Sequence, residues 1–136
     1  DWPDEVYQSV ARLGRCVPRI AIQLAEALET AELVSEEDKP LLNHLDDVRI
    51  AREIDSRGLT RMDFEYLAIL ERATGPVGEQ NILNLMRTVD KDRILNEVEP
   101  FLVRLGFIQH GPRGRELTVD GREYFLAHRL RGGPAS

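Results

Sequence analysis

The stretch FIQHGPRGRELT, residues 107–118, decides the fold of this chain. Residues 107–110 and 115–118 are typical of two short strands, and they flank the segment Gly111-Pro112-Arg113-Gly114. Proline at the second position of a four-residue turn and glycine at the fourth suit a type I turn between antiparallel strands. The sequence therefore predicts a tight β-hairpin with arginine at its tip.

Helices are predicted on both sides of this hairpin. The clearest begins after Thr60, a good N-cap residue with Asp63 three positions later, and runs to about Ala73. Residues 76–78 have room only for a turn or a very short strand. Further helices are predicted over residues 79–87, 90–105 and 119–130. Pro100 must kink the second of these or begin a new turn.

The order of these elements predicts the fold class. From residue 59 onward it is helix, short strand, helix, helix, hairpin and helix, which is the order of a winged helix-turn-helix domain. We therefore expect a mainly α-helical chain with a short β-hairpin wing. The winged-helix domain is placed at residues 59–130, and residues 131–136 are expected to form a disordered tail.

The first 58 residues are predicted to form a separate helical unit. Apolar residues recur there at helical spacing: Val6, Val10, Leu13, Ile20, Leu24 and Leu28. Helices are expected over residues 3–13, 18–33 and 45–56, the last of them ending at Gly58. The domain boundary then falls near residues 57–59.

The charge of the chain is unevenly distributed. There are 24 acidic and 18 basic side chains, a net charge of −6, which argues against a protein that is basic throughout. Residues 101–136, however, have six basic and three acidic side chains, a net charge of +3. The positive charge therefore collects in the part of the chain that contains the hairpin.

The hairpin is the expected DNA contact. Acidic side chains outnumber basic ones over residues 90–99, and carboxylates near phosphates weaken binding, so this helix is not expected to enter the major groove. Arg113 and Arg115 suit contacts to phosphates without strong sequence preference. The alternative is that both are solvated turn residues, because hairpin tips are commonly charged. Two arginines bind weakly, so useful affinity needs several copies or another domain.

No residue pattern predicts catalysis or metal binding. The chain lacks a G-x-x-x-x-G-K-[ST] phosphate loop, and its histidines are scattered: His44, His110 and His128. The single cysteine, Cys16, excludes an intrachain disulfide. It is expected to be a buried structural thiol, with a reactive thiol beside Arg15 and Arg19 as the alternative.

No segment is typical of a membrane or secreted protein. No apolar stretch approaches the roughly 20 residues that span a bilayer, and the beginning of the chain lacks a signal-peptide pattern. A cytoplasmic protein is the simplest interpretation. Because the chain begins with Asp1 rather than methionine, we expect it to be part of a longer protein.

Five segments together resemble one family. VARLGRCVPRIA, residues 10–21, resembles the lid segment R-G-T-P-R-I-A of RuvB proteins, the AAA+ motors of Holliday-junction branch migration. Four further segments resemble the C-terminal winged helix of that family in order and spacing: GPVG at 75–78, EPFL at 99–102, LGFI at 105–108 and PRGR at 112–115.

The resemblance implies a division of labour between the two parts of the chain. Residues 1–58 resemble an AAA+ lid domain, which closes over ATP and Mg²⁺ bound by a preceding ATPase domain. Arg19 matches the family's sensor-2 arginine, which contacts the nucleotide phosphates. Arg113 and Arg115 match wing residues that contact the DNA backbone.

The resemblance also implies an activity and partners for the parent protein. This chain has no Walker A or B motif and is not expected to hydrolyse ATP alone, whereas the full-length parent is expected to be an AAA+ ATPase and DNA helicase of recombination and repair. The implied partners are double-stranded or four-way junction DNA, further copies in a hexameric ring and a RuvA-like junction-binding protein, with no membrane. Cys16 and Val17 depart from the family, which usually has glycine and threonine there.

Two other functions remain open from the sequence. The first is a winged-helix protein–protein interaction module without motor activity, because the net charge of −9 over residues 1–100 suits a basic partner. The second is a transcription regulator, which the acidic helix over residues 90–99 disfavours.

Overall fold

The computed structural model describes residues 2–15, 17–86 and 90–131. Within that range it forms two compact units, one extending to Thr60 and the other beginning at Arg61. None of the helices in the described part of the chain is long and apolar enough to cross a membrane. The disordered tail was predicted from residue 131, but Arg131 is the last residue of a helix. The rest of that prediction, for residues 132–136, and the predicted burial of Cys16 lie outside the described residues.

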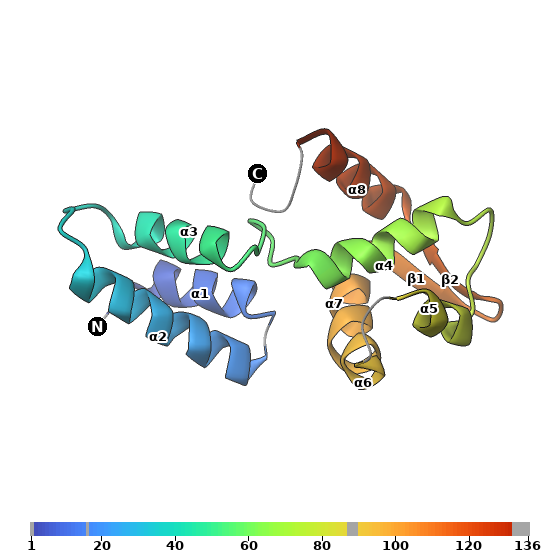
Figure 1. The fold of residues 1–136 in the computed structure, drawn as a ribbon, viewed down its shortest axis with the longest axis horizontal. Helices are drawn as coiled ribbons and strands as arrows, with labels where there is room; N and C mark the ends of the chain where they lie inside the picture. The colour runs from blue at the N-terminus through green and yellow to red at the C-terminus, as the bar shows by residue number, and fades with distance from the viewer. Residues whose placement is uncertain (1, 16, 87–89, 132–136) are drawn as a thin grey trace. The chain divides into compact units, whose positions relative to one another are not determined.

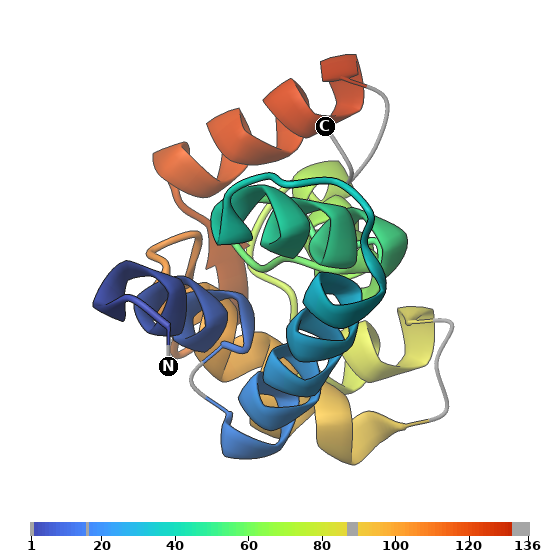
Figure 2. The ribbon, with the colours of Figure 1, turned by 90° about the vertical axis from the view of Figure 1, so that its left-hand side faces the viewer.

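The first unit is a three-helix bundle. It consists of α1 (Asp4–Leu13), α2 (Pro18–Val34) and α3 (Leu41–Ala51), and each helix packs on the other two (Figures 1 and 2). Its core contains the predicted apolar stripes: Val6, Val10, Leu13, Leu24, Leu28, Leu45, Val48 and Ile54. The first two helices are therefore confirmed nearly to their predicted bounds.

The predicted third helix was wrong at both ends. The structure begins α3 at Leu41, directly after Pro40, and ends it at Ala51. Glu53 takes a φ of 58°, so that the Ile54 N–H donates to the Arg49 carbonyl at 2.9 Å. This is the Schellman type of helix end, formed here without the usual glycine. The end signal that the sequence offered at Gly58 instead belongs to the following turn.

The second unit has the predicted winged-helix order. Helix α4 (Arg61–Arg72) is followed by a single bridging residue, Val77, and by α5 (Glu79–Leu85). The remaining elements are α6 (Lys91–Arg93), the π-helical segment η1 (Ile94–Val98), α7 (Glu99–Arg104), β1 (Ile108–Gly111), β2 (Gly114–Leu117) and α8 (Val119–Arg131). The fold class predicted from the sequence is confirmed.

The predicted disturbance at Pro100 is a π-helical turn. The Asp90 side chain caps the start, accepting from the Arg93 N–H at 3.1 Å, and the chain then stays helical through α6, η1 and α7. Proline has no N–H to donate and its ring crowds the preceding turn. The wider turn of η1 ends at Val98, two residues before Pro100, and lets the chain continue as a helix across the proline.

The wing is a hairpin with a two-residue tip. Its register pairs Ile108 with Leu117 and Gly111 with Gly114, which leaves Pro112 and Arg113 as the connecting residues. Both strands lie within one residue of their predicted bounds. On its other side β2 is bridged to Val77, whose N–H and C=O exchange hydrogen bonds of 2.8 Å with Arg115. The predicted very short strand is therefore confirmed as one bridging residue.

Two glycines allow the wing to lie against the rest of the unit. Gly114 has a φ of +131°, and a Cβ there would stand 2.4 Å from the Val77 carbonyl oxygen. A Cβ on Gly121, in the first turn of α8, would stand 2.0 Å from the Phe107 carbonyl oxygen. Thr118 fixes the same turn, because its hydroxyl accepts from the Gly121 N–H and donates to the Gly106 carbonyl.

Substituting Gly121→Ala should therefore destabilise the second unit. The added methyl group meets backbone rather than a movable side chain, and overpacking of this kind costs about 1–3 kcal/mol. Urea unfolding measures the loss, with Gly75→Ala as the control because nothing lies within 4 Å of a Cβ at that position. Equal stability of the two variants would contradict the packing described for α8.

Candidate nucleic-acid interface

Arg113 stands at the exposed tip of the wing. Pro112 before it has a fixed φ, and Gly114 after it has a φ of +131° and packs closely against the backbone of Val77. Among the residues that the structure describes, none forms an ion pair or hydrogen bond with the Arg113 side chain. The guanidinium is thus presented to solvent by a short loop, and the five donors of its fork suit a phosphate.

Arg115, the second predicted contact, has a different environment. Its side chain is only 15% exposed, and the guanidinium lies on the Glu99 carboxylate. Nε donates to Oε2 at 2.8 Å and Nη2 to Oε1 at 3.2 Å, and Nη2 is also 3.4 Å from a carboxylate oxygen of Glu79. The contact of Arg115 with DNA stays a prediction, while the structure gives this arginine protein partners that the sequence did not suggest.

Glu99 is the centre of a buried polar cluster. The residue is 5% exposed, and besides Arg115 it accepts a hydrogen bond of 2.7 Å from the Tyr66 hydroxyl at Oε2. His110 Nε2 lies 3.5 Å from Oε1. A buried carboxylate is tolerated only when paired and hydrogen-bonded, and removing one partner of such a pair costs about 3–5 kcal/mol. We call Glu99, Arg115 and Tyr66 the wing clamp.

The wing clamp changes the acid–base properties of its members. Burial, together with the hydrogen bond to Glu99, raises the pKa of Tyr66 far above its usual value of 10.0. For Arg115, burial lowers the pKa, but the hydrogen bond and charge of Glu99 outweigh burial and raise it. Tyr66 therefore remains a donor and Arg115 a cation throughout the physiological range.

The helix before the wing offers little positive charge to DNA. Arg93, one of its two basic residues before Pro100, has its Nε 3.2 Å from the Glu97 carboxylate. Lys91 and Asp92 are both exposed beside it. The expectation that carboxylates face the phosphates here needs one correction, because Glu99 points into the protein rather than outward.

Three other arginines after residue 100 lie against other groups. Arg104 and Arg129 stand over the rings of Phe101 and Phe125, at 6.0 and 5.8 Å from the ring centroids. Arg122 lies 4.0 Å from the Glu71 carboxylate. Within the described side chains of this region, Arg113 is therefore the arginine with no protein partner.

Arg19, the predicted nucleotide contact, lies in the first turn of α2 directly after Pro18 and is exposed. The positive end of a helix dipole at this place favours an anion, and the arginine adds a full charge. The position suits one contact to a phosphate. The described residues include no group of three histidine, cysteine, aspartate or glutamate side chains that could hold a metal ion.

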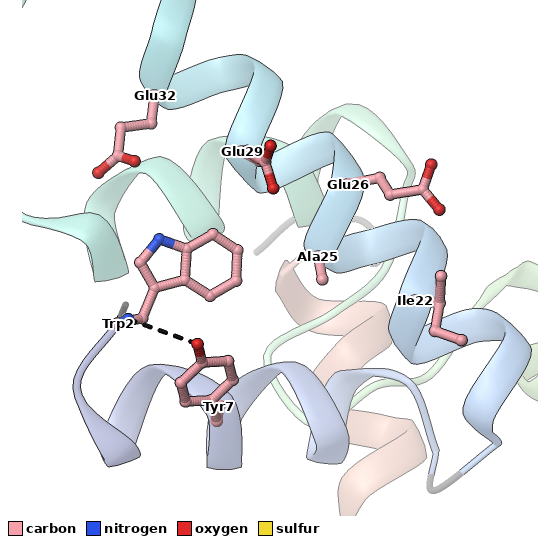
Figure 3. Close-up of a pocket in the computed structure, with 7 residues that line it drawn as sticks. All are labelled: Trp2, Tyr7, Ile22, Ala25, Glu26, Glu29 and Glu32. Atoms are coloured by element: carbon pink, nitrogen blue, oxygen red, sulfur yellow. Dashed lines mark hydrogen bonds between the residues drawn. The ribbon is translucent and has the colours of Figure 1, made fainter.

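A groove in the first unit is lined by acidic and aromatic side chains. Figure 3 shows the rings of Trp2 and Tyr7 close to α2. The centroids of the two rings are 5.5 Å apart. The groove has a volume of about 480 Å³ and is lined by Trp2, Tyr7, Ile22, Ala25, Glu26, Glu29 and Glu32. Three carboxylates would repel a nucleotide's phosphates, and Arg19 is not among the lining residues. The groove is therefore not a candidate nucleotide site.

Comparison with known proteins gives one consistent result. The family model described as the RuvB C-terminal winged helix domain matches residues 56–126. The curated Holliday junction branch migration complex subunit RuvB of Wolbachia sp. subsp. Drosophila simulans (strain wRi) is 31% identical over 121 residues, which is 89% of this chain and 37% of that protein. The subunit of the same name from Anaplasma phagocytophilum (strain HZ) is 32% identical over 130 residues, 95% of this chain and 39% of that protein.

Solved structures agree with the curated relatives. A Thermotoga maritima structure titled RuvB Holliday junction branch migration motor superposes with a TM-score of 0.76 at 27% identity, covering 87% of this chain and 40% of that one. The chain thus spans somewhat over a third of the length of the relatives it matches. The matched region contains both the helical unit and the winged helix.

The raised pKa of Tyr66 predicts a loss of stability at high pH. A group whose pKa is higher in the folded than in the unfolded state stabilises the fold fully at a pH below its unfolded pKa. For Tyr66 this stabilisation is lost as the pH rises above about 10. The free energy of unfolding should fall above that pH, and the fall should be shallower in Tyr66→Phe. Tyr7→Phe, at a half-exposed ring, is the control and should keep the full slope. An unchanged slope in Tyr66→Phe would contradict the assignment.

Proposed function

This chain belongs to the RuvB family, and on that premise we propose that it is the lid and DNA-gripping part of an ATP-dependent DNA motor. In this proposal the winged helix contacts the sugar–phosphate backbone of double-stranded DNA at four-way junctions. The observation that carries it is Arg113, an exposed arginine with no protein partner among the described residues, at the tip of a short hairpin. The name of the relatives, which refers to Holliday junction branch migration, supports the choice of junction DNA.

The proposed contact is weak and indifferent to sequence. One exposed arginine neutralises about one phosphate, so a single chain gains little affinity. Assembly of the parent into a hexameric ring would place several wings on one duplex and multiply the effect. A motor that moves along DNA must release each contact in turn, which a weak, backbone-directed contact permits. Junction specificity would then come from a RuvA-like partner.

We propose residues 1–58 as the AAA+ lid of the parent. The three-helix unit and the exposed Arg19 in the first turn of α2 support this assignment. When bound by the parent, ATP with Mg²⁺ supplies the free energy of movement by hydrolysis. What this chain adds is one fixed cation at a helix start, where it can contact a phosphate and bring the lid toward the nucleotide.

A protein-interaction module without motor activity is the second candidate. The observation that favours it is the acidic, aromatic groove of Trp2, Tyr7 and the three glutamates of α2, in a unit whose residues 1–60 carry 13 acidic and seven basic side chains. Such a surface suits a basic protein partner rather than DNA. Binding of duplex DNA by the full-length protein separates the two candidates.

The duplex-binding assignment predicts a change in salt dependence. Arg113→Ala should weaken binding of the chain to duplex DNA at low salt and reduce the slope of log K against log salt by about 0.9, the value for one phosphate contact. Fluorescence anisotropy with two duplexes of unrelated sequence measures both quantities, and the two duplexes should give equal affinities. If Arg113→Ala has the same salt slope as the unsubstituted chain, the wing tip is not part of the DNA interface.

The lid assignment predicts a separate effect on ATP turnover. In the full-length parent, Arg19→Ala should slow hydrolysis about tenfold or more, because a hydrogen bond to a charged group contributes about 1.5–3 kcal/mol. Arg12→Ala, an exposed arginine at the end of α1, is the matched control and should hydrolyse ATP normally. Normal turnover in Arg19→Ala would exclude its role at the nucleotide.

A further inference from the structure

The wing clamp carries an inference about how the wing is presented to DNA. We propose that Arg115 and Glu99 are positioning residues of the DNA contact: Arg115 does not bind phosphate but fixes the hairpin against α4 and α7, so that, of the two arginines of the wing, Arg113 makes the contact. This inference rests on the proposed function, because it assigns roles within the same interface.

The first argument is the geometry of Arg115. Its backbone exchanges two hydrogen bonds of 2.8 Å with Val77, and its guanidinium makes a bidentate contact with Glu99. The residue is therefore held by both backbone and side chain. Only Pro112 and Arg113 lie beyond the paired strands, so fixing Arg115 also restricts the backbone from which the Arg113 side chain projects.

The second argument compares the costs of the two roles. To contact a phosphate through Nε and Nη2, Arg115 would have to leave a carboxylate that is 5% exposed and that also accepts from Tyr66. Glu99 would then be a buried charge without its cation, which is strongly unfavourable. A phosphate contact in water is weaker than the pair it would replace. Arg113 has no such pair to break.

The third argument is the spread of partners around Glu99. Tyr66 comes from α4, Arg115 from β2 and His110 from β1. Glu79, at the start of α5, has a carboxylate oxygen 3.4 Å from Nη2 of Arg115. One carboxylate thus connects both strands of the wing to the helices behind it. Loss of its charge should loosen the hairpin as a whole.

The proposal makes an unusual prediction of sign. Simple electrostatics says that removing a negative charge from a DNA-binding domain strengthens binding. Glu99→Gln should instead weaken duplex binding, by about threefold if the bound orientation of the wing falls to about a third of the population. Glu116→Gln is the matched control, because Glu116 is an exposed glutamate on the same strand as Arg115. It should bind as well as the parent chain or slightly better.

The salt dependence distinguishes positioning from phosphate contact. Arg115→Gln should weaken binding but leave the slope of log K against log salt as in the unsubstituted chain. Arg113→Gln should lower that slope by about 0.9. Tyr66→Phe keeps the charge of Glu99 and removes one hydrogen bond, so it provides a milder test if Glu99→Gln unfolds. Its effect on affinity should have the same sign. The proposal would be overturned if Glu99→Gln or Tyr66→Phe bound DNA better than the unsubstituted chain. It would also be overturned if Arg115→Gln and Arg113→Gln lowered the salt slope equally.

Amide hydrogen exchange tests the clamp without DNA. The N–H groups of Val77 and Arg115 should exchange faster in Glu99→Gln and Tyr66→Phe than in the parent chain or in Glu116→Gln. Unchanged exchange would overturn the positioning role whatever the DNA result. If neither this chain nor the full-length protein binds duplex DNA while exchange is accelerated as expected, the proposed function is contradicted and the clamp is not.

Discussion

The buried pair of Glu99 and Arg115 is the interaction on which the winged-helix unit depends. A carboxylate that is 5% exposed is stable only because Arg115 and Tyr66 satisfy both of its oxygens. Those partners come from a helix and a strand far apart in sequence. The same pair thereby joins a two-stranded hairpin, which would be marginal alone, to a helical core.

The pair also shows why the net negative charge of the chain does not exclude DNA binding by the wing. All of the −6 is accounted for by residues 1–60, whereas residues 61–136 have 11 acidic and 11 basic side chains. In the second unit, Glu99 faces the protein interior and Glu97 lies against Arg93. An acidic residue opposes DNA binding only where it faces the phosphates. The wing tip can therefore present a net positive charge although the chain as a whole is acidic.

Local sequence signals predicted most of the fold but not the centre of the site. The helix predicted from the spacing of Val6, Val10 and Leu13 is confirmed, and so is the turn predicted at Pro112. Both form through interactions between residues that are close in sequence. The end of α3 was missed because Glu53 adopts a positive φ that glutamate rarely takes. The partner of Arg115 was missed because the pair forms only in the folded chain, across 16 residues, and composition shows Glu99 simply as one more acid. The roles of Arg19 and Arg113 remain predictions.

A double-mutant cycle between Glu99 and Arg115 tests the central claim most directly. Glu99→Gln, Arg115→Gln and the double variant are compared with the parent chain by urea unfolding of the winged-helix unit. A buried ion pair predicts a coupling free energy of about 2 kcal/mol or more. The double variant should then lose less stability than the sum of the losses in the two single variants. Additive losses, with a coupling below about 0.5 kcal/mol, would show that the two residues act independently and that the wing is not held by this pair.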